Sequence, residues 1–150
     1  EAAPGRLESF DAPSGARVFV DYAHTPDALE QVLAALRPLA AGKLVVVFGC
    51  GGDRDKAKRR LMGQVAEAGA DYSILTSDNP RHENPASIVD QIVKGFEQPD
   101  RALRIMDRAE AIESAIRGAA EDDLVLVARH SKRSFEHRFS ACESWRCRAR

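Results

Sequence analysis

The sequence has few cysteines, no long apolar run and almost no net charge, and each of these scarcities excludes a class of protein. The chain has only 3 cysteines among its 150 residues, so we expect no disulfide scaffold. We expect instead a reducing, cytoplasmic setting. The cysteines lack the paired spacing of zinc sites, so no metal site is predicted, and Cys50 reads as a small core residue. No apolar run approaches the roughly 20 residues of a membrane span, and neither end shows a secretory signal.

Charge is low in sum but uneven along the chain. The formal net charge of -1 predicts no nucleic-acid partner. Residues 129–150 carry seven Lys or Arg and only two acidic residues, so residues 1–128 are net acidic. The first 128 residues, with an ordinary globular composition, are interpreted as one domain, and residues 129–150 as an atypical basic tail.

Short apolar runs alternate with helical patterns. The expected strands are 17–22, 44–48, 72–76, 102–106 and 124–127. Capping residues Thr25, Asn84 and Asp107 mark three expected helix starts, and the first helix is expected to carry its apolar face as far as Leu39. This alternation predicts an α/β fold, a Rossmann-like and mainly parallel sheet flanked by helices on both faces.

Ligands of such sheets bind beyond the carboxyl ends of the strands, so the loops there are the candidate sites. Asp21, Tyr22 and His24 follow the first expected strand and precede a helix. A carboxylate at a strand end suits ribose hydroxyls, and an aromatic or imidazole ring can stack on a base. The alternative is a capping loop in which Asp21 is satisfied within the core, and the sequence leaves both interpretations open.

A glycine-rich segment, 49–56, follows the second expected strand and contains Arg54. Glycines at a strand-to-helix junction let backbone amides approach an anion. The segment matches neither the dinucleotide fingerprint nor the Walker A phosphate loop, and no Gly-Lys-Ser/Thr occurs in the chain. The alternative is an ordinary solvated helix start.

The third loop places Asp78 and Arg81 on either side of a rigid Asn-Pro turn. An acceptor and a bidentate donor on one small loop can grip a zwitterion such as an amino acid, through its ammonium and its carboxylate. A plain turn is the alternative.

Six short segments occur in an order that is typical of one family. They are 5–8 (GRLE), 21–27 (DYAHTPD), 48–56 (FGCGGDRDK), 61–63 (LMG), 78–81 (DNPR) and 108–112 (RAEAI). Each is weakly specific alone, but their combination over about residues 4–128 closely resembles the C-terminal domain of the Mur ligases, in the meso-diaminopimelate-adding branch.

The resemblance implies a bacterial, ATP-dependent acid–amino-acid ligase of peptidoglycan synthesis, and hence a role in cell-wall biogenesis, cell shape and division. Such ligases use ATP and Mg²⁺ to turn the D-glutamate carboxylate of UDP-MurNAc-L-Ala-D-Glu into an acyl phosphate, which the amine of meso-diaminopimelate attacks. The resemblance also implies that ATP and magnesium are bound mainly by a central domain. This chain contains neither that domain nor the N-terminal one, so we expect it to be inactive alone.

Roles for individual residues follow from the resemblance. The positions that match nucleotide contacts are Arg6, Asp21, Tyr22 and His24. The positions that match the diaminopimelate site are Arg54, Asp78, Asn79, Pro80 and Arg81. Arg81 is expected to distinguish diaminopimelate from lysine, because a guanidinium is the natural bidentate partner of the extra carboxylate. No catalytic residue is assigned within this chain.

The sequence departs from the family after the last expected strand. Members continue there with Gly-Lys-Gly-His-Glu, which completes the diaminopimelate site, whereas Ala128 is followed here by Arg-His-Ser-Lys-Arg. We interpret residues 129–150 as divergent or frame-shifted sequence, not as a nucleic-acid-binding arm.

Two alternatives remain at this stage. A receiver-like signalling module also has five strand–helix units, with a phospho-acceptor after the third strand (Asp78) and a lysine after the fifth (Lys132). A related ligase of the folylpolyglutamate synthetase type would share the architecture but would not call for Asp-Asn-Pro-Arg.

Overall fold

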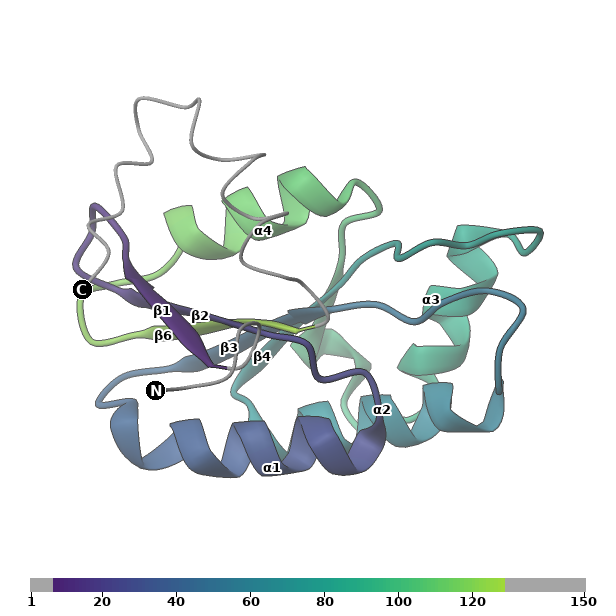
Figure 1. Cartoon of the computed structure of the whole chain (residues 1–150), viewed down its shortest axis with the longest axis horizontal. Coiled ribbons are helices and arrows are strands. Elements are labelled where there is room, and N and C mark those ends of the chain that lie inside the picture. Colours follow the sequence, from purple (N-terminus) through teal and green to yellow (C-terminus); the bar gives the residue numbers. More distant parts are fainter. Residues whose placement is uncertain (1–6, 129–150) are drawn as a thin grey trace.

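The computed structural model describes residues 7–128, which form a six-stranded sheet between helices (Figure 1). Arg6 and the basic tail lie outside the described residues. The strands are β1 (Glu8–Asp11), β2 (Arg17–Asp21), β3 (Leu44–Phe48), β4 (Tyr72–Leu75), β5 (Ala102–Arg104) and β6 (Leu124–Ala128). The helices are α1 (Pro26–Leu36), α2 (Ala57–Gly69), α3 (Pro85–Val93) and α4 (Arg108–Arg117). Single 3₁₀ turns occupy Arg37–Leu39 and Pro99–Arg101.

The strand order is β1-β2-β6-β3-β4-β5, and every neighbouring pair except β1–β2 is parallel. The five parallel strands are those that the apolar runs predict, so the expected mainly parallel α/β sheet is confirmed. The antiparallel edge strand β1 was not predicted. It has four residues, of which only Phe10 is buried, and so lacks a recognisable apolar pattern.

The sheet separates two hydrophobic cores. On one face α1, α2 and α3 pack against the sheet through residues such as Leu33, Met62 and Ile92, all almost fully buried. On the other face α4 covers the sheet through Ile112 and its neighbours. Figure 1 shows α4 alone above the sheet and α1 and α2 below it. Each fully buried aliphatic side chain contributes about 1.5–3 kcal/mol.

The predicted helix starts are confirmed by their caps. Thr25 Oγ1 accepts a hydrogen bond from the N–H of Ala28, Asn84 Oδ1 from Ala86, and Asp107 Oδ1 from Glu110. The donor–acceptor distances are 3.2, 2.9 and 2.9 Å. Each such cap stabilises its helix by about 1 kcal/mol.

The prediction that the first helix extends to Leu39 is wrong. The helix ends at Leu36, and a 3₁₀ turn that contains Pro38 follows it. This turn rotates Leu39 away from the buried face, and 55% of the residue is exposed. Proline does not continue a helix well, because it has no backbone N–H to donate to the carbonyl oxygen four residues earlier.

The strand order also excludes the receiver-like alternative. Numbered among the parallel strands alone, the order here is 1-5-2-3-4, because β6 lies between β2 and β3. Receiver domains have the order 2-1-3-4-5. The chain therefore has the alternating elements of that class but not its topology.

Candidate functional site

The three candidate loops meet at the carboxyl edge of the sheet. The glycine-rich loop contacts the loop after β4, because the N–H of Gly52 donates to the carbonyl oxygen of Asn79 at 3.0 Å. Helix α2, which follows the glycine-rich loop, is bonded to the loop after β2. Nζ of Lys58 on α2 donates to the carbonyl oxygen of His24 at 2.9 Å. The parallel sheet thus brings together segments that are separated by up to about 60 residues in sequence.

Asp21, at the end of β2, is buried and bonded within the fold. Its two carboxylate oxygens accept hydrogen bonds from the N–H groups of Leu7 and Ala23, at 2.9 and 2.8 Å. The same residue lines a cavity of about 400 Å³ together with Tyr22 and His24. The interpretation of Asp21 as satisfied within the fold is confirmed, and its nucleotide contact stays a prediction, which its place at the cavity wall permits.

Tyr22 and His24 lie in an edge-to-face arrangement, with ring centroids 5.7 Å apart. Tyr22 is 54% exposed. They also line a second cavity of about 490 Å³, whose wall includes Arg54 and Lys58. The structure therefore places Arg54, matched to the amino-acid site, directly beside two residues matched to the nucleotide site. Asp55 also lines this cavity, so its wall combines two cations, one carboxylate and two rings.

The glycines of the second loop are required by its packing. A Cβ atom added at Gly52 would overlap the carbonyl oxygen of Pro80, and one added at Gly49 would overlap the carbonyl oxygen of Thr76. Glycine permits this close approach of two backbones. The Gly-rich pattern, which by sequence could indicate anion binding, thus has a structural role here in joining the second and third loops.

The third loop holds Arg81 in an unusual backbone conformation. Its φ is 50°, and the φ of Asn79 is 25°. Asp53, in the facing loop, also has a positive φ, of 51°. Non-glycine residues rarely adopt this region, and where they do, surrounding contacts must hold them. One such contact is the hydrogen bond that the Arg81 guanidinium donates to the carbonyl oxygen of Gly52.

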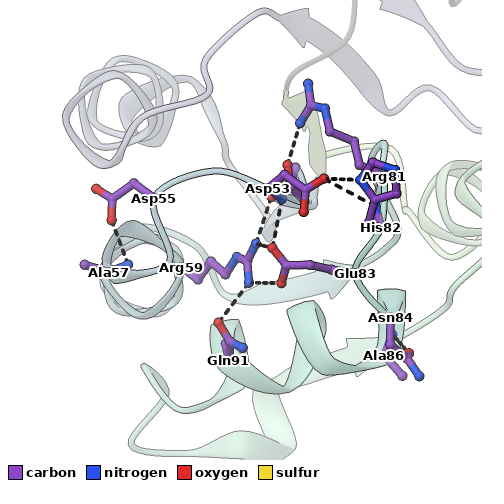
Figure 2. Close-up of polar contacts among 12 residues, drawn as sticks. Asp53, Asp55, Ala57, Arg59, Arg81, His82, Glu83, Asn84, Ala86 and Gln91 are labelled. Carbon is purple, nitrogen blue, oxygen red and sulfur yellow. Dashed lines mark hydrogen bonds and ion pairs between the residues drawn. The ribbon is translucent and has the colours of Figure 1, made fainter.

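Sequence reasoning missed the ion pair between Arg59 and Glu83, which lies behind these loops (Figure 2). The Arg59 side chain is fully buried. Its hydrogen bonds lower the pKa of Glu83 to about 2 and raise the pKa of Arg59 above its ordinary value. The available signal was spacing: Arg59 lies three residues before the buried Met62, on the apolar side of α2.

Another cavity, of about 620 Å³, lies at the opposite, amino end of the parallel strands, and most of the charged side chains that line it are engaged in the fold. Arg37 pairs with Asp71 at 2.8 Å, and the Glu67 carboxylate accepts from the N–H groups of Glu97 and Gln98. In the described part of the chain, no three His, Cys, Asp or Glu side chains are grouped to hold a metal ion. Nor does that part contain a helix long and apolar enough to cross a membrane.

Comparison with known families identifies the domain. The family model described as "Mur ligase, glutamate ligase domain" matches residues 5–128. The chain belongs to this family. A Coxiella burnetii diaminopimelate ligase, named UDP-N-acetylmuramoyl-L-alanyl-D-glutamate--2,6-diaminopimelate ligase, is 52% identical over 125 residues. A Ralstonia nicotianae protein of the same name is 54% identical over 127 residues.

The Mur ligase domain makes up only part of these relatives. Each alignment covers 83% of this chain but only 26% and 25%, respectively, of the Coxiella and Ralstonia proteins. The chain therefore spans about a quarter of the length of the curated relatives that it matches.

Solved structures agree with the fold. A structure of a diaminopimelate ligase of the same name superimposes with a TM-score of 0.80 at 45% identity, over 87% of this chain and 27% of that one. A folylpolyglutamate synthase/dihydrofolate synthase from Yersinia pestis gives a TM-score of 0.69 at 21% identity, over 93% of this chain and 31% of that one. The second likeness shows the shared Rossmann-like fold alone.

Proposed function

We propose that this domain serves a ligase that joins meso-diaminopimelate to the D-glutamate of UDP-MurNAc-L-Ala-D-Glu with hydrolysis of ATP. The observation that carries the proposal is the meeting of Arg54 and the 78–81 loop at one edge of the sheet, beside Tyr22 and His24, in a chain of the Mur ligase family. Because the chain spans a quarter of its relatives, the remaining parts of the site belong to other domains.

The reaction proceeds in two steps. A carboxylate oxygen of the D-glutamate attacks the γ-phosphorus of ATP, and ADP leaves. The amine of diaminopimelate then attacks the acyl carbon, the C–O bond to phosphate breaks, and the nitrogen loses a proton to give the amide. The contribution of this domain is to position the amine, since a held and oriented nucleophile reacts far faster than a free one.

Arg81 is the residue that we assign to the distal carboxylate of diaminopimelate. Its guanidinium has five donors, of which one is used by the carbonyl oxygen of Gly52, so a bidentate pair with a carboxylate is still available. Arg54 supplies a second cation nearby on the glycine-rich loop, and Asp78 and Asn79 supply oxygen acceptors for the ammonium groups. Lysine lacks the distal carboxylate and would leave Arg81 unpaired.

On the nucleotide side we assign Asp21, Tyr22 and His24, which line the two cavities, together with Arg6 from outside the described residues. The family uses Mg²⁺ with ATP, but the described residues offer no group of carboxylates that fits a metal ion, so no Mg²⁺ ligand is assigned to them. A bacterial cytoplasmic location follows from the use of ATP. Residues 129–150 are assigned no part in binding, and their divergent or frame-shifted origin stays a prediction.

The test is a chimeric ligase in which residues 5–128 replace the matching domain of the Coxiella burnetii relative. We expect it to add meso-diaminopimelate and not lysine. Arg81→Ala should raise KM for diaminopimelate by about ten- to a hundredfold, because the distal carboxylate of the substrate loses its bidentate partner. Arg117→Ala, which removes an exposed arginine from α4 on the other face, is the control. An unchanged KM for diaminopimelate in Arg81→Ala would refute the assignment.

A further inference from the structure

Arg59 uses both of its terminal nitrogens within the fold, while its buried Nε has no hydrogen-bond partner among the described residues. Its side chain, on the first turn of α2, is 0% exposed. One terminal nitrogen donates to Oε2 of Glu83 at 2.8 Å and to Oε1 of Gln91 at 2.9 Å. The other donates to the carbonyl oxygen of Gly51 at 3.0 Å and to Oε1 of Glu83 at 2.9 Å. All four terminal N–H groups therefore have acceptors, from three different segments (Figure 2).

Glu83 extends the connection back to the glycine-rich loop. Its Oε1 also accepts a hydrogen bond from the N–H of Asp53 at 2.8 Å. The Asp53 carboxylate in turn lies 2.8 Å from Nδ1 of His82. Figure 2 shows these groups gathered on one side of Arg59, between the two loops. Arg54 directly follows Asp53, and Arg81 lies two residues before Glu83, so the ion pair lies immediately behind both exposed arginines.

Stability alone does not account for this ion pair. Removing the Arg59 charge from water costs several kcal/mol, while Glu83 stays partly exposed, and an apolar residue of similar volume often serves a core equally well. The backbone around the pair is also in the positive-φ region at Asp53 and at Arg81. Such conformations persist only where surrounding contacts hold them. The pair is therefore best explained by the loop arrangement that it holds.

We propose that Arg59 is a positioning residue, which through Glu83 and Gly51 fixes the spacing between the Arg54 and Arg81 guanidinium groups. It touches no substrate itself. The ion pair joins the two loops through Glu83 and Gly51, and the joined loops carry both Arg54 and Arg81. The inference rests on the proposed function, because it takes these two arginines as the amino-acid-binding groups.

The first test measures the coupling in the complete 150-residue chain, by amide hydrogen exchange. Arg59→Met should speed exchange at Gly52 and Asp53 by at least about tenfold, while amides of β3 and β6 stay within about threefold. Arg60→Met, at the adjacent exposed position of α2, should change neither. If Arg59→Met does not fold, Glu83→Gln on the exposed side of the pair gives the same comparison. Equal acceleration in loops and sheet, or none at Gly52 and Asp53, would overturn the proposal.

The second test separates positioning from general damage in the chimeric ligase. Arg59→Met should raise KM for meso-diaminopimelate by about tenfold or more and leave KM for ATP within about twofold. Arg59→Lys, which keeps the charge, should recover part of the loss. A parallel rise in both KM values, or a lysine variant no better than methionine, would contradict the proposal. If the unaltered chimera adds no diaminopimelate, the proposed function fails, and the exchange experiment still decides whether Arg59 couples the loops.

Discussion

The carboxylate of Asp21 is shared between the fold and the cavity beside it. By accepting from the N–H groups of Leu7 and Ala23, it fixes the backbone on both sides of the end of β2. Tyr22 and His24 are held at the cavity wall by the same backbone. If Asp21 contacts the nucleotide as we propose, a functional assay alone would not separate that contact from its structural role.

Replacing Asp21 should therefore affect stability as well as binding. Asp21→Ala leaves two backbone N–H groups without their acceptor, and we expect a loss of about 1–3 kcal/mol in the free energy of unfolding. Asp21→Asn should lose less, because its amide oxygen can still accept one bond. Urea unfolding of the 150-residue chain measures both, with Glu30→Ala on the exposed side of α1 as control. In the chimeric ligase, KM for ATP should rise more than KM for diaminopimelate, and the reverse order would reject the nucleotide role.

Glu83 gives the chain a defined acid sensitivity. Its pKa falls from 4.5 to about 2 because of the hydrogen bonds from Arg59. A carboxyl group with a lowered folded-state pKa adds stability above its unfolded pKa, and this stability is lost as pH falls toward the folded value. The stability difference between the parent chain and Glu83→Gln should thus be constant above about pH 5 and shrink between pH 4.5 and 2. Urea unfolding at a series of pH values measures it, and a difference independent of pH would contradict the ion pair.

At the scale of the elements, apolar runs and capping residues predicted most of the strands and helix starts. Strands β2, β3, β4 and β6 are mostly apolar because both of their faces are covered, and the helix starts carry Thr, Asn or Asp caps with local partners. Such signals lie within a few residues of one another in sequence. The edge strand β1 and the end of α1 were missed because a short half-exposed strand and a proline turn give weak local patterns.

The candidate site was only partly predictable for the same reason. The loops at the strand ends could be located, because parallel topology dictates where carboxyl ends meet. For Arg59 the only local signal was its spacing from Met62, which is weak because an arginine in a helix normally faces solvent, and its burial depends on Glu83, 24 residues away. Likewise, the glycine-rich pattern did not reveal that Gly52 packs against Pro80, a contact between segments that are distant in sequence.

The contact between the two loops predicts opposite outcomes for two glycines. Gly52→Ala places a methyl group against the backbone of Pro80, and we expect a loss of about 1–3 kcal/mol, as in other overpacked positions. Gly118→Ala is the matched control, because its φ is −79° and the nearest atom to the new Cβ is the Ser114 oxygen at 3.3 Å. It should be neutral or stabilising by up to about 1 kcal/mol. Thermal unfolding of both variants tests this, and equal melting temperatures would count against the close loop packing.

For the whole molecule, the central position of β6 determines how much stability a substitution in each strand costs. Leu126 on β6 is fully buried between strands β2 and β3, whereas Leu103 on the edge strand β5 is 54% exposed. We expect Leu126→Ala to cost about 2–5 kcal/mol and Leu103→Ala about 0.5 kcal/mol or less. Denaturant unfolding followed by circular dichroism measures both. Similar losses for the two variants would be inconsistent with the strand order described here.

The place of β6 also bears on how the chain folds during its synthesis. It is the last strand along the described residues, yet it lies between β2 and β3 and completes the hydrogen bonding of both. At a typical ribosomal rate of about 5–20 residues per second, several seconds pass between the emergence of β3 and that of β6. Throughout this interval, β2 and β3 each present an open edge to the solvent. The nascent domain is therefore most exposed to aggregation, and most dependent on chaperones, just before its final described strand leaves the ribosome.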